Sequence, residues 1–166
     1  IVYSRKLRQL YPDSNIVIGG LEASLRRFAH YDYWDDAVRP SILLDSQADL
    51  LLYGMGEKVI TQLTQRLRQG EALETIRDLR GCCYLCRQEE IPQDSVSCAS
   101  FHKVSENKES YAKAHQIQTE WQDAVYGKTI VQKQTDTLYL VQNPPMPSLT
   151  REELDEVFDL PFTRTY

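Results

Sequence analysis

The amino-acid sequence predicts an α/β fold with a parallel sheet of the doubly wound type. An apolar run at 16–18 and a second one at 49–53 are each followed by glycines and then by a helix-like segment. A repeated order of strand, glycine turn and helix is typical of parallel α/β sheets, in which ligands bind beyond the carboxyl ends of the strands. We therefore predict a Rossmann-like domain whose functional edge lies at these glycines.

The first strand is preceded by one helix and followed by another. Residues 2–11 carry apolar side chains at helical spacing, and Pro12-Asp13 ends that pattern. The run Ile16-Val17-Ile18 is typical of a strand buried on both faces. The segment LEASLRRFA at 21–29 predicts the helix that follows the first glycine pair.

The second strand, at 49–53, leads into a longer helix. Apolar residues recur at helical spacing over 57–69, and Gly70 is the expected C-cap. A further strand is predicted within 76–90, and the Pro-containing stretch at 91–94 reads as a turn.

The last third of the chain differs in character. Residues 107–123 form a polar helix with apolar residues on one side, and 129–133 with 137–141 form a predicted hairpin. Thr150 and Glu153 make a capping box that opens a final helix.

We divide the chain into a partial Rossmann-like accessory domain over 1–100 and an α+β appendage over 101–166. The appendage comprises the helix, the hairpin and a linker segment. The chain opens at Ile1 without a methionine, and we expect it to be a fragment of a longer protein.

Composition excludes some classes of function. The net charge is −5 and the pI about 5.2, which argues against a broadly basic nucleic-acid face. No apolar run approaches the length of a membrane span. The cysteines of GCCYLC are expected to be reduced thiols in a cytoplasmic protein.

Candidate ligand-binding residues follow the two strands. Glycine allows a backbone to approach a ligand closely, and a helix N-terminus favours anions. The other interpretation of GMGE is a tight turn in which Glu57 is stabilised by the helix dipole. The candidates at these two turns are Gly19, Gly20, Glu22, Gly54, Gly56 and Glu57.

Four residues have spacing that would suit a Cys3His zinc site: Cys83, Cys86, Cys98 and His102. However, Cys83 and Cys86 lie in a strand-like run, where a CxxC pair needs a turn to converge. The alternative is that these cysteines are small buried apolar residues, and we predict no metal site.

The stretch RRFAHYDYWDD at 26–36 supports three interpretations. His30 with Asp32, Asp35 and Asp36 could bind a metal or perform acid–base chemistry. Arg26, Arg27 and the aromatic residues could clamp and stack on a nucleobase. The structural alternative is a helix end whose aromatic side chains pack while Arg–Asp pairs satisfy each other.

Long motifs resemble a known family. The run IVIGGLEASLRRFAHYDYWDDAVRPSILLDSQADLLLYGMGE is similar to the N-terminal region of the YgiQ family of radical S-adenosylmethionine (SAM) proteins. Further motifs of this resemblance are IRDLRG, SFHKVSENKESYAKA, GKTIVQKQTDTLYLVQNPP and ELDEVFDLPFTRTY. Together they span essentially the whole chain.

The resemblance implies a radical SAM barrel after this chain, with a CxxxCxxC motif that ligates a [4Fe-4S] cluster. That cluster binds and reductively cleaves S-adenosylmethionine. None of the four cysteines here matches the motif. The α/β part is similar to cobalamin-binding domains, but their DxHxxG motif is absent, so the resemblance does not extend to cobalamin.

Our leading hypothesis is an N-terminal accessory fragment of a radical SAM iron–sulfur oxidoreductase, not catalytic alone, which covers or shapes the substrate site of its own barrel. The substrate is unknown. Segments 19–27, 30–36 (with Tyr33) and 54–57 are expected to face it.

Two rival hypotheses stay open. The first is a nucleotide- or RNA-binding module that uses Arg26, Arg27, Tyr31, Trp34 and Arg39. The second is a purely structural domain that docks on the barrel. An exposed strand edge could also produce a homodimer.

Overall fold

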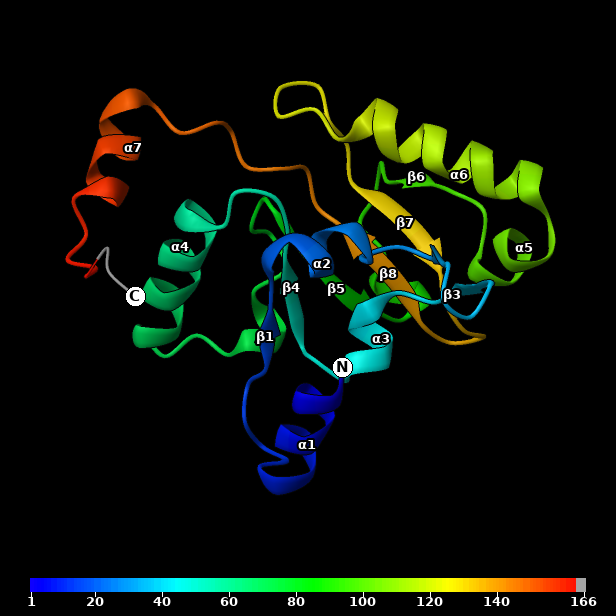
Figure 1. Ribbon diagram of the computed structural model, residues 1–166, viewed down its shortest axis with the longest axis horizontal. Helices are drawn as coiled ribbons and strands as arrows, with labels where there is room; N and C mark the ends of the chain where they lie inside the picture. The colour runs from blue at the N-terminus through cyan, green and yellow to red at the C-terminus, as the bar shows by residue number, and fades with distance from the viewer. Residues whose placement is uncertain (164–166) are drawn as a thin grey trace.

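The computed structural model describes residues 1–163 and is built around one six-stranded sheet (Figure 1). Across the sheet, the strands are β1 (Val17–Ile18), β4 (Leu50–Leu52), β5 (Cys82–Cys86), β8 (Tyr139–Gln142), β7 (Ile130–Lys133) and β6 (Val96–Ser97). The α/β class predicted from the sequence is therefore confirmed.

The sheet is mixed rather than uniformly parallel. β1 pairs parallel with β4, and β6 pairs parallel with β7, whereas the β4–β5, β5–β8 and β7–β8 pairings are antiparallel. The predicted C-terminal hairpin is β7–β8, but it is not a separate appendage. Because β8 pairs with β5 from Cys83↔Gln142 to Cys86↔Tyr139, the hairpin lies inside the sheet.

Alternating side chains on the strands build one core on each face of the sheet. Leu51, Cys83, Ile130 and Leu140 contribute to a core that is covered by α2 (Gly20–Leu25), α3 (Ile42–Ser46), α5 (Phe101–Glu106) and α6 (Lys108–Trp121). On the other face, Leu50, Leu52, Cys82, Tyr84 and Val141 pack against α4 (Glu57–Arg68) and the 3-10 turn η1 (Leu73–Thr75). A second 3-10 turn, η2 (Gln88–Glu90), follows β5.

Local sequence signals explain where several helices begin. The side chain of Asn107 accepts a hydrogen bond from the Ser110 amide at the start of α6. The predicted capping box is present at α7 (Arg151–Phe158), where Thr150 and Glu153 exchange hydrogen bonds. α7 lies beside α4, to which it is linked by an ion pair of 2.6 Å between Lys58 and Glu153 (Figure 1).

The stretch 26–36 is not the end of a helix, so that structural alternative is wrong: 26–29 form a turn, and the residues that follow form the first strand and the tip of a β-hairpin. α2 ends at Leu25, and β2 (His30–Asp32) pairs antiparallel with β3 (Ala37–Arg39). The chain leaves the helix because the carbonyl of Arg26 accepts a hydrogen bond from the Ile42 amide, which lies beyond the hairpin. The aromatic and β-branched residues of the stretch favour a strand.

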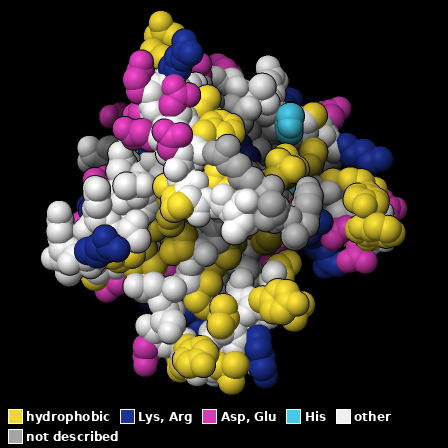
Figure 2. Space-filling model, turned by 60° about the vertical axis from the view of Figure 1, so that its left-hand side comes forward, with side chains coloured by type: hydrophobic (Ala, Val, Ile, Leu, Met, Phe, Trp, Pro, Cys, Tyr) yellow, Lys and Arg dark blue, Asp and Glu magenta, His cyan; other side chains and the backbone are white. Residues whose placement is uncertain are grey.

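α1 (Val2–Leu10) has no buried residue, although it is amphipathic. Its Arg8 side chain binds Asp49, while Tyr3, Leu7 and Leu10 are exposed. Figure 2 shows apolar side chains gathered at the lower end of the molecule, where α1 lies. Among the described residues, no helix is both long and apolar enough to cross a membrane.

Candidate functional site

The glycine turns that follow β1 and β4 lie side by side. The two strands run parallel in the register Val17↔Leu50, so both turns emerge at the same edge of the sheet. The Gly54 amide donates a hydrogen bond of 3.1 Å to the hydroxyl of Ser24, which links the turn after β4 to the helix α2 that follows the first turn. Gly54 has φ +72°, a conformation that glycine adopts without strain.

Gly19 is required by close approach rather than by its φ. A Cβ atom there would lie 3.2 Å from the backbone oxygen of Leu52. The absence of a side chain at Gly19 thus lets the turn after β1 lie close to the end of β4. We call the surface formed by 19–27 and 53–57 the strand-end edge.

Arg27 is the most connected side chain of the strand-end edge. Its guanidinium donates hydrogen bonds to the Gln142 side chain, to the Ser24 carbonyl and, over 3.0 Å, to the Gln122 side chain. It also lies 4.9 Å from the centre of the Tyr53 ring. All three of these acceptors are neutral oxygens.

The remaining arginines proposed to bind nucleic acid are engaged within the molecule. Arg26 pairs with Glu22 at 3.4 Å, and Arg39 pairs with Asp35. The Tyr31 hydroxyl donates to Asp36 over 2.7 Å. These contacts satisfy the groups that would otherwise bind phosphate, so the geometry does not favour the RNA-binding hypothesis.

A groove of about 840 Å³ opens beside the strand-end edge, between α4 and α7. Its polar lining includes Glu57 and Lys58 from the start of α4 and Arg80 from the IRDLRG motif. The Arg80 guanidinium binds the carbonyls of Ala124 and Pro145 at 2.6 and 2.9 Å. A groove of this size can hold a small molecule.

Two buried side-chain atoms within the described part of the chain have no hydrogen-bond partner. One is Glu57 Oε2, in the wall of the groove, and the other is Gln142 Nε2, next to the oxygen that binds Arg27. Unsatisfied buried polar atoms are costly and are often explained by a bound ligand or water. Both lie close to the strand-end edge, which makes that edge the strongest candidate site.

The candidate site residues of the β2–β3 hairpin lie away from the groove. The hairpin β2–β3 packs against α5 and α6, on the opposite side of the molecule from α4 (Figure 1). Partial burial lowers the pKa of His30, and its Nδ1 lies 3.1 Å from the Phe28 carbonyl. Asp35 pairs with Arg39, and Tyr33 is exposed at the hairpin tip.

The four residues of the zinc alternative do not converge. Cys83 faces the core that contains Cys98, whereas Cys86 faces the opposite core, because successive side chains of a strand alternate. His102 is exposed and lies 3.6 Å from Glu106. Burial raises the pKa of Cys86 to about 11 and of Cys82 and Cys98 to about 12, so these thiols stay protonated. Residues 1–163 contain no group of three potential metal ligands.

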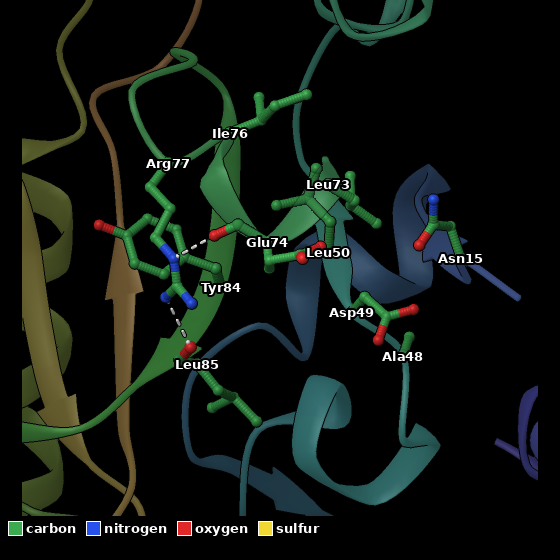
Figure 3. Close-up of a pocket in the computed structure, with 10 residues that line it drawn as sticks. All are labelled: Asn15, Ala48, Asp49, Leu50, Leu73, Glu74, Ile76, Arg77, Tyr84 and Leu85. Carbon is green, nitrogen blue, oxygen red and sulfur yellow. Dashed lines mark hydrogen bonds between the residues drawn. The ribbon is translucent and has the colours of Figure 1, made fainter. Parts of the chain in front are cut away.

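A smaller cavity of about 250 Å³ lies at the other end of β4, away from the glycine turns (Figure 3). The Arg77 guanidinium crosses it and donates to the carbonyls of Glu74 and Leu85. Asp49, at its rim, binds Arg8 and the Ile16 amide. Because these polar groups already have partners, the cavity offers few groups to a ligand.

Sequence reasoning missed a set of buried side-chain amides that connect the base of the β2–β3 hairpin to the sheet. Gln132 accepts from the Ala29 amide and donates to the Ala99 carbonyl, both over 2.9 Å. Gln134 accepts from the Ser41 amide. The available signal was the pair of glutamines two positions apart, in and just after a strand, which in isolation reads as a solvent-facing side.

Comparison with known proteins defines the class. The chain matches the family described as Radical SAM N-terminal over residues 1–166. It therefore belongs to the Radical SAM N-terminal family.

Its relatives include a UPF0313 protein of Clostridium botulinum (strain 657 / Type Ba4), which is 54% identical over 166 residues. A UPF0313 protein of Clostridium perfringens (strain ATCC 13124) is 50% identical over 167 residues. The alignments cover 100% of this chain but 26% and 25% of those relatives, so the chain spans about a quarter of their length. No solved structure matches the chain.

Proposed function

We propose that the chain is the N-terminal accessory part of a radical SAM iron–sulfur enzyme and that it carries no catalytic activity alone. The family membership and the greater length of the relatives support this proposal. The [4Fe-4S] cluster and S-adenosylmethionine would be bound by the rest of the longer polypeptide. This part of the enzyme would cover or shape the substrate site.

The cysteines of this chain do not fit a cluster site. A cluster requires several thiolates that converge on one point. Cys82 and Cys86 lie in one core, Cys83 and Cys98 in the other, and burial raises the pKa of all four thiols. We therefore assign these cysteines to packing and derive no redox step through them.

The observation that carries the proposed role is the strand-end edge. Two parallel strands end there in neighbouring glycine turns, the described hydrogen-bond acceptors of Arg27 are all neutral oxygens, and the groove beside it contains Glu57 Oε2, which has no partner among the described residues. We propose that this edge faces the substrate, as ligands bind at the corresponding edge of doubly wound sheets. The unit β1–α2–β4–α4 would be the Rossmann-like part of the domain.

A truncation tests the covering role. Longer polypeptides with and without residues 1–166 would be reconstituted anaerobically with iron and sulfide. We expect both to form a cluster and to cleave S-adenosylmethionine, with much faster bleaching of the cluster by oxygen in the truncated form. Failure of the truncated form to assemble a cluster, while it remains folded by circular dichroism, would contradict the proposal.

A further inference from the structure

The tip of the β2–β3 hairpin presents two large aromatic side chains to solvent. Tyr33 is 67% exposed and Trp34 78% exposed. Their rings lie together, with centroids 4.9 Å apart and planes tilted by 32°. Leaving two neighbouring aromatic rings in water forgoes a large gain from burial.

The polar groups beneath these rings are used to fix the shape of the tip. The Tyr31 hydroxyl donates to Asp36 over 2.7 Å, and Asp32 accepts from the Trp34 amide over 3.0 Å. Asp35 pairs with Arg39. The conformation of the hairpin is thus determined from within, without help from the two rings.

The base of the hairpin is anchored to the core. The Ala29 amide, before β2, donates to buried Gln132, and the Ser41 amide, after β3, donates to buried Gln134. The Tyr31 amide donates to the Tyr111 hydroxyl on α6 over 3.1 Å. A surface held this firmly loses little conformational entropy when it binds.

We propose that the hairpin tip, defined by Tyr33 and Trp34, is a preformed anchor that inserts into an apolar pocket on the remainder of the same longer polypeptide. This inference rests on the proposed function, because it requires that such a remainder exists. Exposed aromatic residues on a rigid support are typical of residues that dominate an interface.

The charge of the hairpin tip and the length of the relatives indicate which partner the tip binds. Asp32 and Asp36 form no ion pair with any described residue, and Arg39 is already neutralised by Asp35, so the tip carries net negative charge. This charge disfavours nucleic acid, and it disfavours a second copy whose identical tip would face it. The relatives contain about three quarters of their length outside the matched region, which supplies a partner within the same chain. The pocket should have an apolar floor and a basic rim.

Hydroxyl-radical footprinting of the intact longer polypeptide tests the insertion directly. Trp34 is more exposed than the partly buried Trp121 in this chain. We expect the order of labelling to reverse in the intact protein, with Trp34 and Tyr33 modified several-fold more slowly than Trp121. Trp34 remaining the faster-labelled tryptophan would overturn the inference.

Substitutions in the same intact protein identify the partner. We expect Tyr33→Ala with Trp34→Ala to speed proteolytic separation of the N-terminal part several-fold. Tyr126→Ala, which removes an aromatic side chain that is 79% exposed outside the hairpin, is the matched control and should change nothing. Loss of a dimer in sedimentation, or loss of binding to a single-stranded RNA oligonucleotide, would instead assign the tip to a second copy or to nucleic acid.

The outcomes of these docking experiments are independent of the proposal that the rest of the longer polypeptide carries the catalytic activity. Cluster formation and cleavage of S-adenosylmethionine by the longer polypeptide test that division. If they occur while Trp34 stays accessible, the docking inference alone fails.

Discussion

Two adjacent arginines illustrate how different the roles of neighbouring residues can be. Arg27 spans the α2 end, β8 and the residue after α6 through Ser24, Gln142 and Gln122. Arg26 makes an ion pair with Glu22, one turn away in sequence, whose side chain is largely exposed. The sequence alone does not distinguish the two arginines, because the partners of Arg27 lie up to 115 positions away along the chain.

We expect Arg27→Met to lower the free energy of unfolding by about 2–4 kcal/mol, since three hydrogen bonds to a charged group are lost. Arg26→Met should cost at most about 0.5 kcal/mol, because an exposed ion pair contributes little. Urea denaturation followed by circular dichroism measures both. Equal losses would show that Arg27 has no special structural role.

His30 gives the fold a pH dependence of predictable sign. Burial lowers its pKa in the folded state below the ordinary value of 6.5. The unfolded chain therefore binds a proton at a higher pH than the folded chain, so stability is lost as the pH falls below 6.5 and through the folded pKa. Arg66 lowers the pKa values of Glu71 and Asp78, so the protonation of these two carboxylates affects stability only at more acidic pH.

Urea denaturation at a series of pH values between about 7 and 5 tests this assignment. We expect His30→Gln to flatten the dependence in this range, whereas His102→Gln, at an exposed position on α5, should retain it. A slope that survives His30→Gln would have to come from another group.

At the scale of elements, the predictions succeeded where local signals were complete. Periodicity and caps identified α1, α4, α6, α7 and the β7–β8 hairpin. For 26–36 the sequence offers a helix end as the structural alternative, and the β2–β3 hairpin is not among its predictions. The conformation of this hairpin is specified by Gln132 and Gln134, which lie about a hundred residues further along the chain.

The substitution Gln132→Leu tests whether the buried glutamines determine the conformation of the β2–β3 hairpin. The change keeps the side chain similar in volume but leaves the Ala29 amide, the Ala99 carbonyl and the Gln134 amide group without their partner. We expect a loss of about 3 kcal/mol or more, because each unsatisfied buried polar group costs about 1–3 kcal/mol. Hydrogen exchange at Ala29 should accelerate in parallel.

The matched control is Gln116→Leu, at an exposed position of α6. A substitution there should stay within about 0.5 kcal/mol. If Gln132→Leu were equally mild, the buried amides would not determine the hairpin.

At the scale of the whole molecule, the sequence revealed the α/β class but not the directions of the strands. The two strand–glycine–helix units correctly placed β1 beside β4 and their turns at one edge. The antiparallel entry of β5 and the insertion of β8 next to it depend on long-range pairing, for which a short apolar run carries no signal. The candidate glycines therefore came together as predicted, while Arg80, Gln142 and the groove emerged only from the tertiary structure.

The division of labour between this chain and the rest of a longer polypeptide belongs to the same scale. The thiols lie in two separate cores, and residues 1–163 contain no group of three potential metal ligands. This arrangement is consistent with our proposal that the chemistry of the radical SAM enzyme is carried by the rest of the longer polypeptide.

Anaerobic reconstitution with iron and sulfide tests this division most directly. It would be followed by the visible absorbance of the cluster and by assay for 5′-deoxyadenosine after reduction with S-adenosylmethionine present. We expect the longer polypeptide to bind a [4Fe-4S] cluster and form 5′-deoxyadenosine, and residues 1–166 alone to do neither. Cluster binding with cleavage of S-adenosylmethionine by residues 1–166 alone would contradict the assignment of this chain as a non-catalytic accessory part.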